Sequence, residues 1–491
     1  MERVAWLRSF GLRRDPFEAP DARRDEVLAL EPMGMLHVRY AEVHGATEVP
    51  HSCLIEGVTG SGRTALCMQL VAEDEHAALQ RPGLGRRVVP IDRFTEVSRE
   101  VEQRRGSAIT ACEALDLILH RIVPEIVDEV LGHANDGTRP RMPVADAAAA
   151  IESAGPSACR DLLVLQTLYD RADGTPSRTM LLRDRFALSG GVLAEASRSW
   201  GLVLLGSSAV LGIVLVVFGD RLDAALERSL PSVAPEWARA LPWIGLGLVL
   251  SASLGLLGRW AVAGLLARSR VRRAMRSILV TDRDAEDLAT CLNELRPVDL
   301  RRVPRRGAIG PRLELLDRLE RIVRLLGWNS IAVVVDGVDD DVDSRRAIKA
   351  LLDERIVQRS GTSVVLAAPP SAVEDVRVPC SRVVLDWPVP ALRRLIQSRL
   401  DRCVDRPVAP PSLDALFEPA ITSSEIDGWL ARWATPGVAL DALHRLVVAH
   451  TEPTSSPLRS LDADEPSELR PAAHPITRAT IERVLGRQRP A

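Results

Sequence analysis

Two long apolar segments in the middle of the chain restrict its fold more than any other feature of the sequence. Residues 200–219 carry no charge over 20 residues, and residues 240–258 carry none over 19. At the rise of an α-helix, each segment reaches about 28–30 Å, close to the hydrocarbon thickness of a bilayer. The sequence therefore predicts a transmembrane helical hairpin. The alternative, a pair of buried core helices in a soluble protein, is less favoured because core helices usually keep a polar face.

The arginines around these segments predict their orientation in a membrane. The outer flanks, residues 183–198 and 259–276, hold nine arginines, whereas the connection at 220–239 holds three. Arginine-rich flanks are typically retained in the cytoplasm. We therefore expect a protein of the inner (cytoplasmic) membrane with two spans and both termini in the cytoplasm.

A glycine-rich loop follows a short apolar run upstream of these segments. Residues 53–56 are typical of a buried strand, residues 57–64 read GVTGSGRT, and an apolar helical pattern follows. G-x4-G-[K/R]-T between a strand and a helix is the pattern of a phosphate-binding loop, whose amides and helix N-terminus face the anion. The alternative is a glycine-rich turn without a ligand. The predicted cofactor-binding residues are Gly57, Val58, Thr59, Gly60, Ser61, Gly62, Arg63 and Thr64.

Arg63 stands where a phosphate-binding loop usually has lysine. Lys349 is the only lysine of the chain, so nearly all of the 63 Lys and Arg residues are arginine. A guanidinium group is planar and larger than an ammonium group, so the exchange is not conservative in a tight site. It still offers positive charge to phosphates.

An acidic motif ends a second apolar run. Residues 331–335 are unbroken apolar sequence, typical of a strand that is buried on both faces, and Asp336 follows directly. Ligands of α/β sheets bind at the carboxyl ends of the strands. We expect Asp336 and Thr64 to hold Mg²⁺ for a bound nucleotide, and Asp339 and Asp340 to act as catalytic residues that orient or deprotonate water. An acidic turn that merely caps a core strand is the alternative.

Charge and cysteine content disfavour other classes of function. The net charge is −3 and the pI is about 6.4, so no basic field indicates nucleic-acid binding. The seven cysteines are scattered without C-x-x-C spacing, which disfavours a zinc site or a disulfide framework.

The motifs and the loop signals between them predict seven segments. They are an N-terminal segment (1–45), the first half of a P-loop NTPase domain (46–125), a helical insert (126–197), the transmembrane hairpin (198–260), a basic juxtamembrane linker (261–309), the second half of the P-loop NTPase domain (310–404), and a helical lid and tail (405–491).

A phosphate loop and an acidic strand end separated by a membrane hairpin resemble the KAP family, a STAND group of P-loop ATPases related to AAA+ proteins. The residues that carry the resemblance are 57–64, the hairpin at 200–258, and the sequence DGVDD at 336–340. Residues 10–17, FGLRRDPF, resemble the G-L-x-x-x-P-F opening of some bacterial AAA-type ATPases. The resemblance implies an α/β fold. This fold would have a three-layer P-loop NTPase sheet interrupted by the hairpin, and a C-terminal α-helical lid. The resemblance also implies ATP with Mg²⁺ as ligands and regulated assembly into a homo-oligomer.

Several departures from that pattern predict slow turnover, or binding without turnover. Besides Arg63, no glutamate follows Asp336 directly, and the predicted strand at 363–368 runs into two prolines where a polar sensor residue is expected. The predicted lid helix after residue 434 has no arginine before Arg445, although related ATPases place a phosphate-sensing arginine there.

These features lead to one functional hypothesis and two alternatives. The hypothesis is a membrane-anchored, cytoplasm-facing ATP-binding switch with weak hydrolysis. A catalytically inactive nucleotide-sensing membrane scaffold is the first alternative, and a small pore formed by assembled hairpins is the second. The expected partners are the lipid bilayer, further copies of the chain and an unidentified protein.

Overall fold

A computed structural model places most of the chain outside the two apolar segments. It describes residues 2–18, 21–30, 39–44, 51–81, 83–132, 143–171, 174–188, 271–278, 284–295, 297–374, 376–377, 379–404, 409–452 and 474–485, with scattered residues between 207 and 269.

The chain divides into two compact units. The first, here called the sheet unit, comprises Met1–Ala111 and Gly327–Ala491, and the second, the helical unit, comprises Cys112–Leu326. The sheet unit is therefore built from two segments that are more than 200 residues apart in the sequence.

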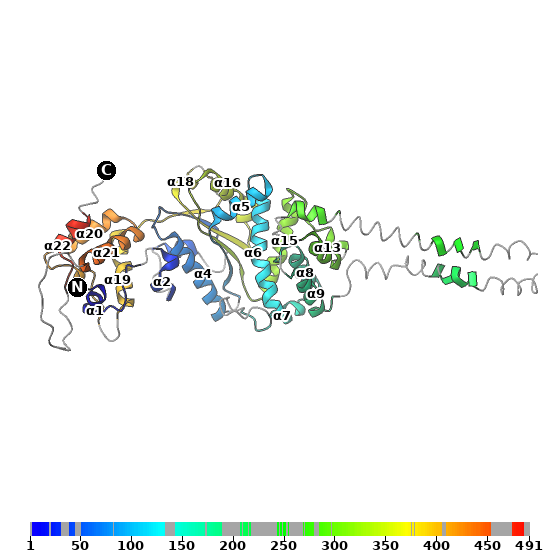
Figure 1. The fold of residues 1–491 in the computed structure, drawn as a ribbon, viewed down its shortest axis with the longest axis horizontal. Coiled ribbons are helices and arrows are strands. Elements are labelled where there is room, and N and C mark those ends of the chain that lie inside the picture. The colour runs from blue at the N-terminus through cyan, green and yellow to red at the C-terminus, as the bar shows by residue number, and fades with distance from the viewer. Residues whose placement is uncertain are drawn as a thin grey trace, which may run out of the picture. The chain divides into compact units, whose positions relative to one another are not determined.

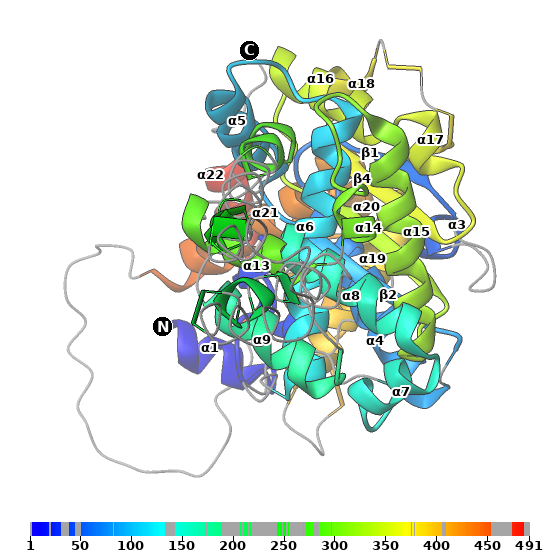
Figure 2. The ribbon, with the colours of Figure 1, turned by 90° about the vertical axis from the view of Figure 1, so that its right-hand side faces the viewer.

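The sheet unit contains a five-stranded parallel sheet. The strands lie in the order β2-β3-β4-β1-β5, and Figure 2 shows β1 and β4 side by side. Glu56, the last residue of β1, is in register with Ala368 and Val384, so the carboxyl ends of β1, β4 and β5 meet at one edge. Val335, which ends β3, is likewise in register with Ile91 at the end of β2. The strands are β1 (Cys53–Glu56), β2 (Arg86–Ile91), β3 (Ser330–Val335), β4 (Thr362–Ala368) and β5 (Ser381–Val384).

The central strands form because their residues are apolar on both faces. Every residue of β1, β3 and β4 is buried, as expected for parallel strands covered by helices. The short edge strand β5 is exposed at three of its four positions. The strands at 53–56, 331–335 and 363–368 that the apolar runs predicted are therefore present.

Helices lie on both faces of the sheet. Helix α4 (Arg63–Gln80) connects β1 to β2 and packs against β2, β3 and β4, with Leu66 and Leu70 facing Ile55 and Val334 in one core. Helix α17 (Glu354–Val357) packs against β4, and α5 (Phe94–Arg105) and α18 (Pro370–Val373) pack against α16 (Val342–Leu351). Figure 1 shows α4 on one side of the sheet and α5, α16 and α18 on the other.

Residues from both ends of the sheet unit share a second apolar core, here called the terminal helical cluster. Trp6 and Phe17 near the N-terminus pack with Leu400, Leu416 and Trp433 from the C-terminal part. The elements around this core are α1 (Arg3–Ser9), α19 (Val389–Arg402), η3 (Asp414–Leu416), α20 (Ser423–Trp433), α21 (Pro436–Thr451) and α22 (Arg478–Leu485). The short elements η1 (Ala22–Arg24), α2 (Glu26–Leu30) and α3 (Tyr40–His44) follow α1.

The helical unit is a bundle in which α8 contacts α7, α9, α13 and α15. Its elements are α6 (Ala111–Leu131), α7 (Ala147–Ser153), α8 (Pro156–Tyr169), α9 (Thr175–Arg185), α13 (Ala285–Glu294), α14 (Pro297–Leu300) and α15 (Ile309–Leu325). A buried ion pair joins two of these helices: Arg312 of α15 donates to both carboxylate oxygens of Asp116 of α6 at 2.9 and 3.0 Å.

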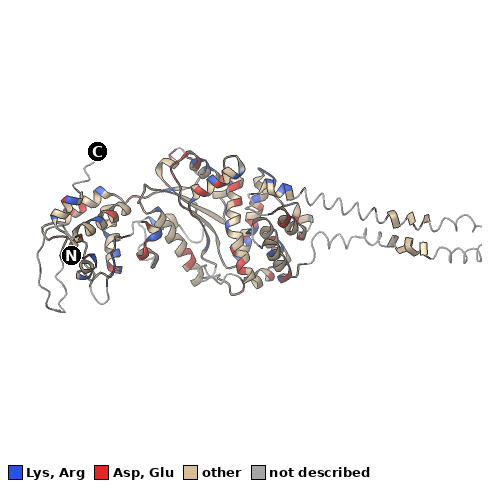
Figure 3. Cartoon of the chain, in the orientation of Figure 1, with Lys and Arg blue, Asp and Glu red and all other residues tan. Residues whose placement is uncertain are grey.

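The predicted fold class, a three-layer α/β sheet interrupted by a transmembrane hairpin, is wrong. The described residues are mostly helical around a small five-stranded parallel sheet. In the part of the chain that the structure describes, no helix is long and apolar enough to cross a membrane. The two longest helices there, α6 and α4, carry six and four charged residues, and Figure 3 shows acidic and basic residues spread along the helices of both units.

The predicted localisation, a two-span protein of the cytoplasmic membrane, conflicts with the same finding. A charged side chain at the centre of a bilayer is costly, so helices such as α4 and α6 do not serve as spans. Most of residues 200–219 and 240–258, the two predicted spans, lie outside the described residues.

Candidate functional site

The glycine-rich loop connects the carboxyl end of β1 to the first turn of α4. Helix α4 begins at Arg63, and Gly62 is its N-cap with φ +89°. A residue with a side chain is strained in this left-handed conformation, so glycine suits the sharp entry into the helix. Because the N-terminal amides of a helix lack partners within the helix, this end of α4 can bind an anion.

Thr64 and Asp336 meet at the carboxyl ends of β1 and β3. The Thr64 hydroxyl donates to Oδ2 of Asp336 at 2.9 Å, across 272 residues of sequence. The Asp336 side chain is 8% exposed, and Oδ2 also accepts from the guanidinium of Arg23 at 2.7 Å. The structure therefore brings the two predicted metal ligands together.

The oxygens of this pair suit a magnesium ion that is shared with a phosphate. Among the described residues, no group of three or more His, Cys, Asp or Glu side chains could hold a metal ion. Mg²⁺, however, is usually held by one or two protein oxygens together with substrate phosphates and water. The adjacent hydroxyl of Thr64 and carboxylate of Asp336 fit that requirement.

Arg63 brings a partly buried positive charge to the loop. Burial lowers the pKa of its guanidinium, and the nearby Asp336 carboxylate opposes that shift. Within the described ranges, Arg63 forms neither a hydrogen bond nor an ion pair. A partly desolvated cation gains most from an anionic partner, which a phosphate group would supply.

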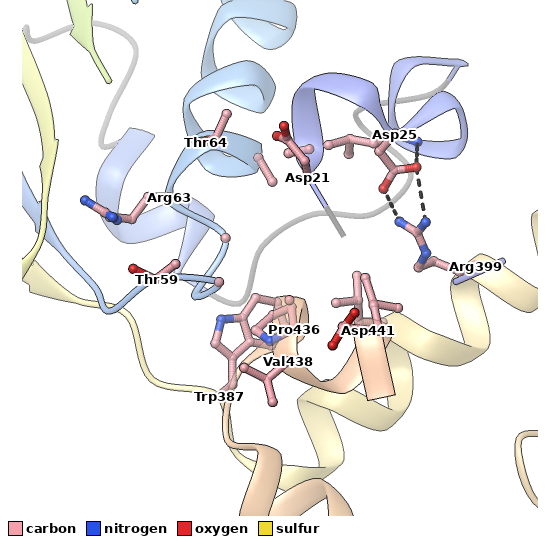
Figure 4. A pocket seen from close by; sticks show the side chains of 18 of the residues that line it. Asp21, Asp25, Thr59, Arg63, Thr64, Trp387, Arg399, Pro436, Val438 and Asp441 are labelled. Atoms are coloured by element: carbon pink, nitrogen blue, oxygen red, sulfur yellow. Dashed lines mark hydrogen bonds and ion pairs between the residues drawn. The ribbon is translucent and has the colours of Figure 1, made fainter. Parts of the chain in front are cut away.

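A cavity of about 520 Å³ opens beside the loop. Figure 4 shows Thr59, Arg63 and Thr64 of the loop on one part of its wall, with Asp21 and Asp25 from the N-terminal segment nearby. The opposite part is formed by Trp387, Pro436, Val438 and Asp441. Leu28, Leu395 and Leu440 add apolar surface to the lining. This volume lies within the usual range for small-molecule sites, about 300–1,000 Å³.

Two hydrogen bonds to loop carbonyls connect the loop to the terminal helical cluster and to the segment before it. The amide of Gly437, in the first turn of α21, donates to the carbonyl of Gly60 at 2.9 Å. A Cβ at Gly437 would lie 2.8 Å from the Gly60 Cα, so glycine permits this close approach. The Trp387 indole donates to the Ser61 carbonyl at 2.8 Å. The loop is therefore bonded at Gly60 to α21 of the cluster, and at Ser61 to the segment that precedes α19.

Asp339 and Asp340 lie away from the cavity wall. Their side chains are 61% and 53% exposed, and their nearest cations are Arg99 at 3.7 Å and Arg345 at 3.8 Å. None of Asp336, Asp339 and Asp340 lines the cavity, but Asp336 contacts Thr64, which does. The structure thus joins the predicted metal ligands to the loop, but it does not bring the two predicted catalytic aspartates there.

The sequence did not identify two residues that the structure places at the site. Arg23 reaches Asp336 across 313 residues, and Trp387 covers the loop from the segment that follows β5. The sequence FGLRRDPF at 10–17 pointed only to the N-terminal region in general. No local pattern marks which of many arginines meets the buried carboxylate.

We expect Gly337→Ala to destabilise the acidic loop. Gly337 has φ +74°, and a Cβ there would lie 2.6 Å from the Cα of Arg93. The left-handed conformation costs about 1–2 kcal/mol for alanine, and the overlap with backbone adds roughly 1–3 kcal/mol. Chemical denaturation measures the sum.

Gly106→Ala is the matched control for this substitution. Gly106 has φ +64° but no neighbouring atom within 4 Å of the added Cβ, so only the conformational cost applies. Equal losses of unfolding free energy in the two variants would mean that the close approach to Arg93 is unimportant.

Comparison with known proteins identifies no relative. No family model, no curated protein and no solved structure matches the chain. The resemblance to the KAP family therefore stays a prediction from the sequence.

Proposed function

We propose that this protein binds a nucleoside triphosphate, with ATP and Mg²⁺ as the expected ligands, and acts as a nucleotide-dependent switch. The contact between Thr64 and Asp336 is the observation that carries the proposal. It joins a glycine-rich loop at a helix N-terminus to a buried carboxylate that follows β3, the strand that β4 separates from β1. A magnesium-bound triphosphate requires this combination of groups.

Each part of a nucleotide has a suitable partner at the site. The loop amides and the first turn of α4 would bind phosphate oxygens, and Arg63 would add charge. Thr64 and Asp336 would hold the metal ion. The cavity beside the loop offers an indole and aliphatic side chains for a base, together with carboxylates that could accept hydrogen bonds from an exocyclic amine.

The contact between Gly60 and Gly437 supports a switch. A phosphate that binds the loop acts on Gly60, and Gly60 contacts the first turn of α21 directly. Any rearrangement of the loop on binding therefore changes the position of α21 in the terminal helical cluster. A ligand shifts such an equilibrium only by its differential affinity for the two arrangements.

Binding without turnover is the second candidate function. The positions of Asp339 and Asp340 favour it, because both side chains are mostly exposed and neither lines the cavity. A nucleotide sensor that holds a protein partner would need the loop, Thr64 and Asp336 but no residue to activate water.

Equilibrium ATP binding by the Arg63→Ala variant tests the proposal. Hydrogen bonds to charged groups contribute about 1.5–3 kcal/mol, so we expect the affinity to fall roughly 10- to 100-fold. Calorimetric titration with Mg²⁺ present measures the change. Arg81→Ala is the matched control, because Arg81 lies at the opposite end of α4 and is exposed.

Two results would contradict the proposal: no ATP binding by the parent protein, or equal affinities in the Arg63→Ala and Arg81→Ala variants. Phosphate release under the same conditions then separates the two candidate functions. Turnover that is lost in the Asp339→Asn, Asp340→Asn double variant would support a hydrolytic switch. Tight binding without phosphate release would support the sensor.

A further inference from the structure

We propose that Arg23 is an internal counterion of Asp336, and that it must leave this carboxylate before Asp336 can take part in binding a magnesium–nucleotide complex. The inference rests on the proposed function and adds regulation to the same site. Arg23 belongs to η1, and its Nη2 atom lies 2.7 Å from Oδ2 of Asp336.

The carboxylate of Asp336 needs a positive charge when no metal ion is bound. Its side chain is 8% exposed, and a buried carboxylate without a cation or hydrogen bonds is strongly disfavoured. Arg23 meets this need in the present structure, although its own side chain is 38% exposed. A divalent cation would meet the same need. Because two cations close to one oxygen repel each other, the metal ion and Arg23 are alternatives at this position.

The contact lies on the Asp336 oxygen that also faces Thr64, the other proposed metal ligand. Oδ2 of Asp336 accepts from Arg23 and from the Thr64 hydroxyl, which lies at 2.9 Å. Both predicted metal ligands are thus tied to each other, and a guanidinium covers the shared oxygen. Arg23 also has a second anion within reach, because Oδ1 of the exposed Asp92 lies 3.7 Å from the same nitrogen. The guanidinium can therefore turn to Asp92 and remain paired.

Movement of Arg23 would also change the cavity. Asp21 and Ala22, which immediately precede Arg23, line the cavity, as do Asp25 and Leu28. Asp21 caps η1 by accepting from the Arg23 amide at 3.1 Å, so η1 and the guanidinium belong to one short element. By linkage, the position of this element and the binding of the metal–nucleotide complex affect each other equally.

The magnesium dependence of ATP binding tests the inference. We expect Arg23→Gln to lower the Mg²⁺ concentration that half-saturates ATP binding by about three- to tenfold, since a competing, partly exposed ion pair is removed. Arg24→Gln is the matched control. Arg24 carries the same charge in the same turn, its side chain is exposed, and it should behave like the parent.

Hydrogen exchange provides a second readout on the parent protein, which does not depend on how a variant folds. Amides of residues 21–28 should exchange faster when ATP and Mg²⁺ are added together than when ATP is added with EDTA. The Val27 and Leu28 amides, which donate to Asp25 at 3.0 and 3.2 Å, report on the same segment.

The outcomes separate this inference from the proposed function. ATP binding with the same or a higher magnesium requirement in Arg23→Gln, together with unchanged exchange in the parent, overturns the role of Arg23 but leaves nucleotide binding intact. A parent protein that binds no ATP at any Mg²⁺ concentration overturns the proposed function, and the inference falls with it.

Discussion

Asp336→Asn is expected to weaken magnesium-dependent ATP binding by about 100-fold, because the proposed metal ligand, which is bonded to Thr64, loses its charge. Asparagine keeps the size of the side chain and one acceptor oxygen, so the effect reports charge rather than packing. The measurement is ATP affinity with saturating Mg²⁺ and again with EDTA. The loss should be confined to the magnesium condition.

Asp343→Asn is the control for this prediction. Asp343 lies in the first turn of α16, seven residues further along, and it is partly exposed and only loosely paired with Arg346 at 3.6 Å. The affinity of the Asp343→Asn variant for ATP should match that of the parent. An equal fall in both variants would point to a general charge effect, and an unchanged affinity in Asp336→Asn would exclude Asp336 from the proposed metal site.

Arg312→Ala should have the largest effect on stability. Both Arg312 and Asp116 are fully buried, and Asp116 also accepts from the Tyr169 hydroxyl at 2.8 Å. Burial opposes the charge on Arg312, but attraction to Asp116 and the hydrogen bonds that Arg312 donates to it outweigh burial, so the pKa of the guanidinium is raised. Removing one partner of a buried pair leaves an uncompensated charge, and we expect a loss of about 3–5 kcal/mol.

Urea unfolding followed by circular dichroism measures this loss, and hydrogen exchange in α6 and α15 assigns it to the helical unit. Arg321→Ala on the same helix is the control, because Arg321 is 63% exposed and pairs with Asp161 at 3.1 Å. Exposed pairs contribute about 0–1 kcal/mol. The double variant Arg312→Met, Asp116→Leu should recover part of the stability, since a buried pair is often replaceable by apolar residues. The recovery is incomplete because the buried Tyr169 hydroxyl loses its acceptor. A double variant as unstable as Arg312→Ala would contradict this explanation.

Local patterns in the sequence predicted the parts of the site that a few neighbouring residues specify. The apolar run at 53–56 forms β1, the glycines after it form the loop, and α4 starts at Arg63 as the motif indicates. The run at 331–335 lies in β3, and Asp336 follows its end. These features depend on backbone conformation and burial over fewer than ten residues, which the residue types determine directly.

Hydropathy alone was a poor guide to the fold class and the localisation. The two uncharged runs have the length and composition of spans, yet no helix of the described residues meets the requirements for crossing a membrane. Length and apolar content describe a segment by itself, whereas the fold class depends on how many elements form and how they pack. The charged and largely buried α6 illustrates the difference, since its charge pairs with α15 inside the helical unit.

Tertiary structure alone decided which distant side chains meet. Thr64 reaches Asp336, Arg23 covers the same carboxylate, and the Gly437 amide contacts the glycine-rich loop, each across more than 260 residues. It also decided that Asp339 and Asp340 point toward Arg99 and Arg345 and not toward the cavity. The sequence by itself determined the strands, the loop and the chemical groups that they carry, because these depend on local conformation. The pairing of those groups depends on the packing of two sequence segments into one sheet, which no local pattern encodes.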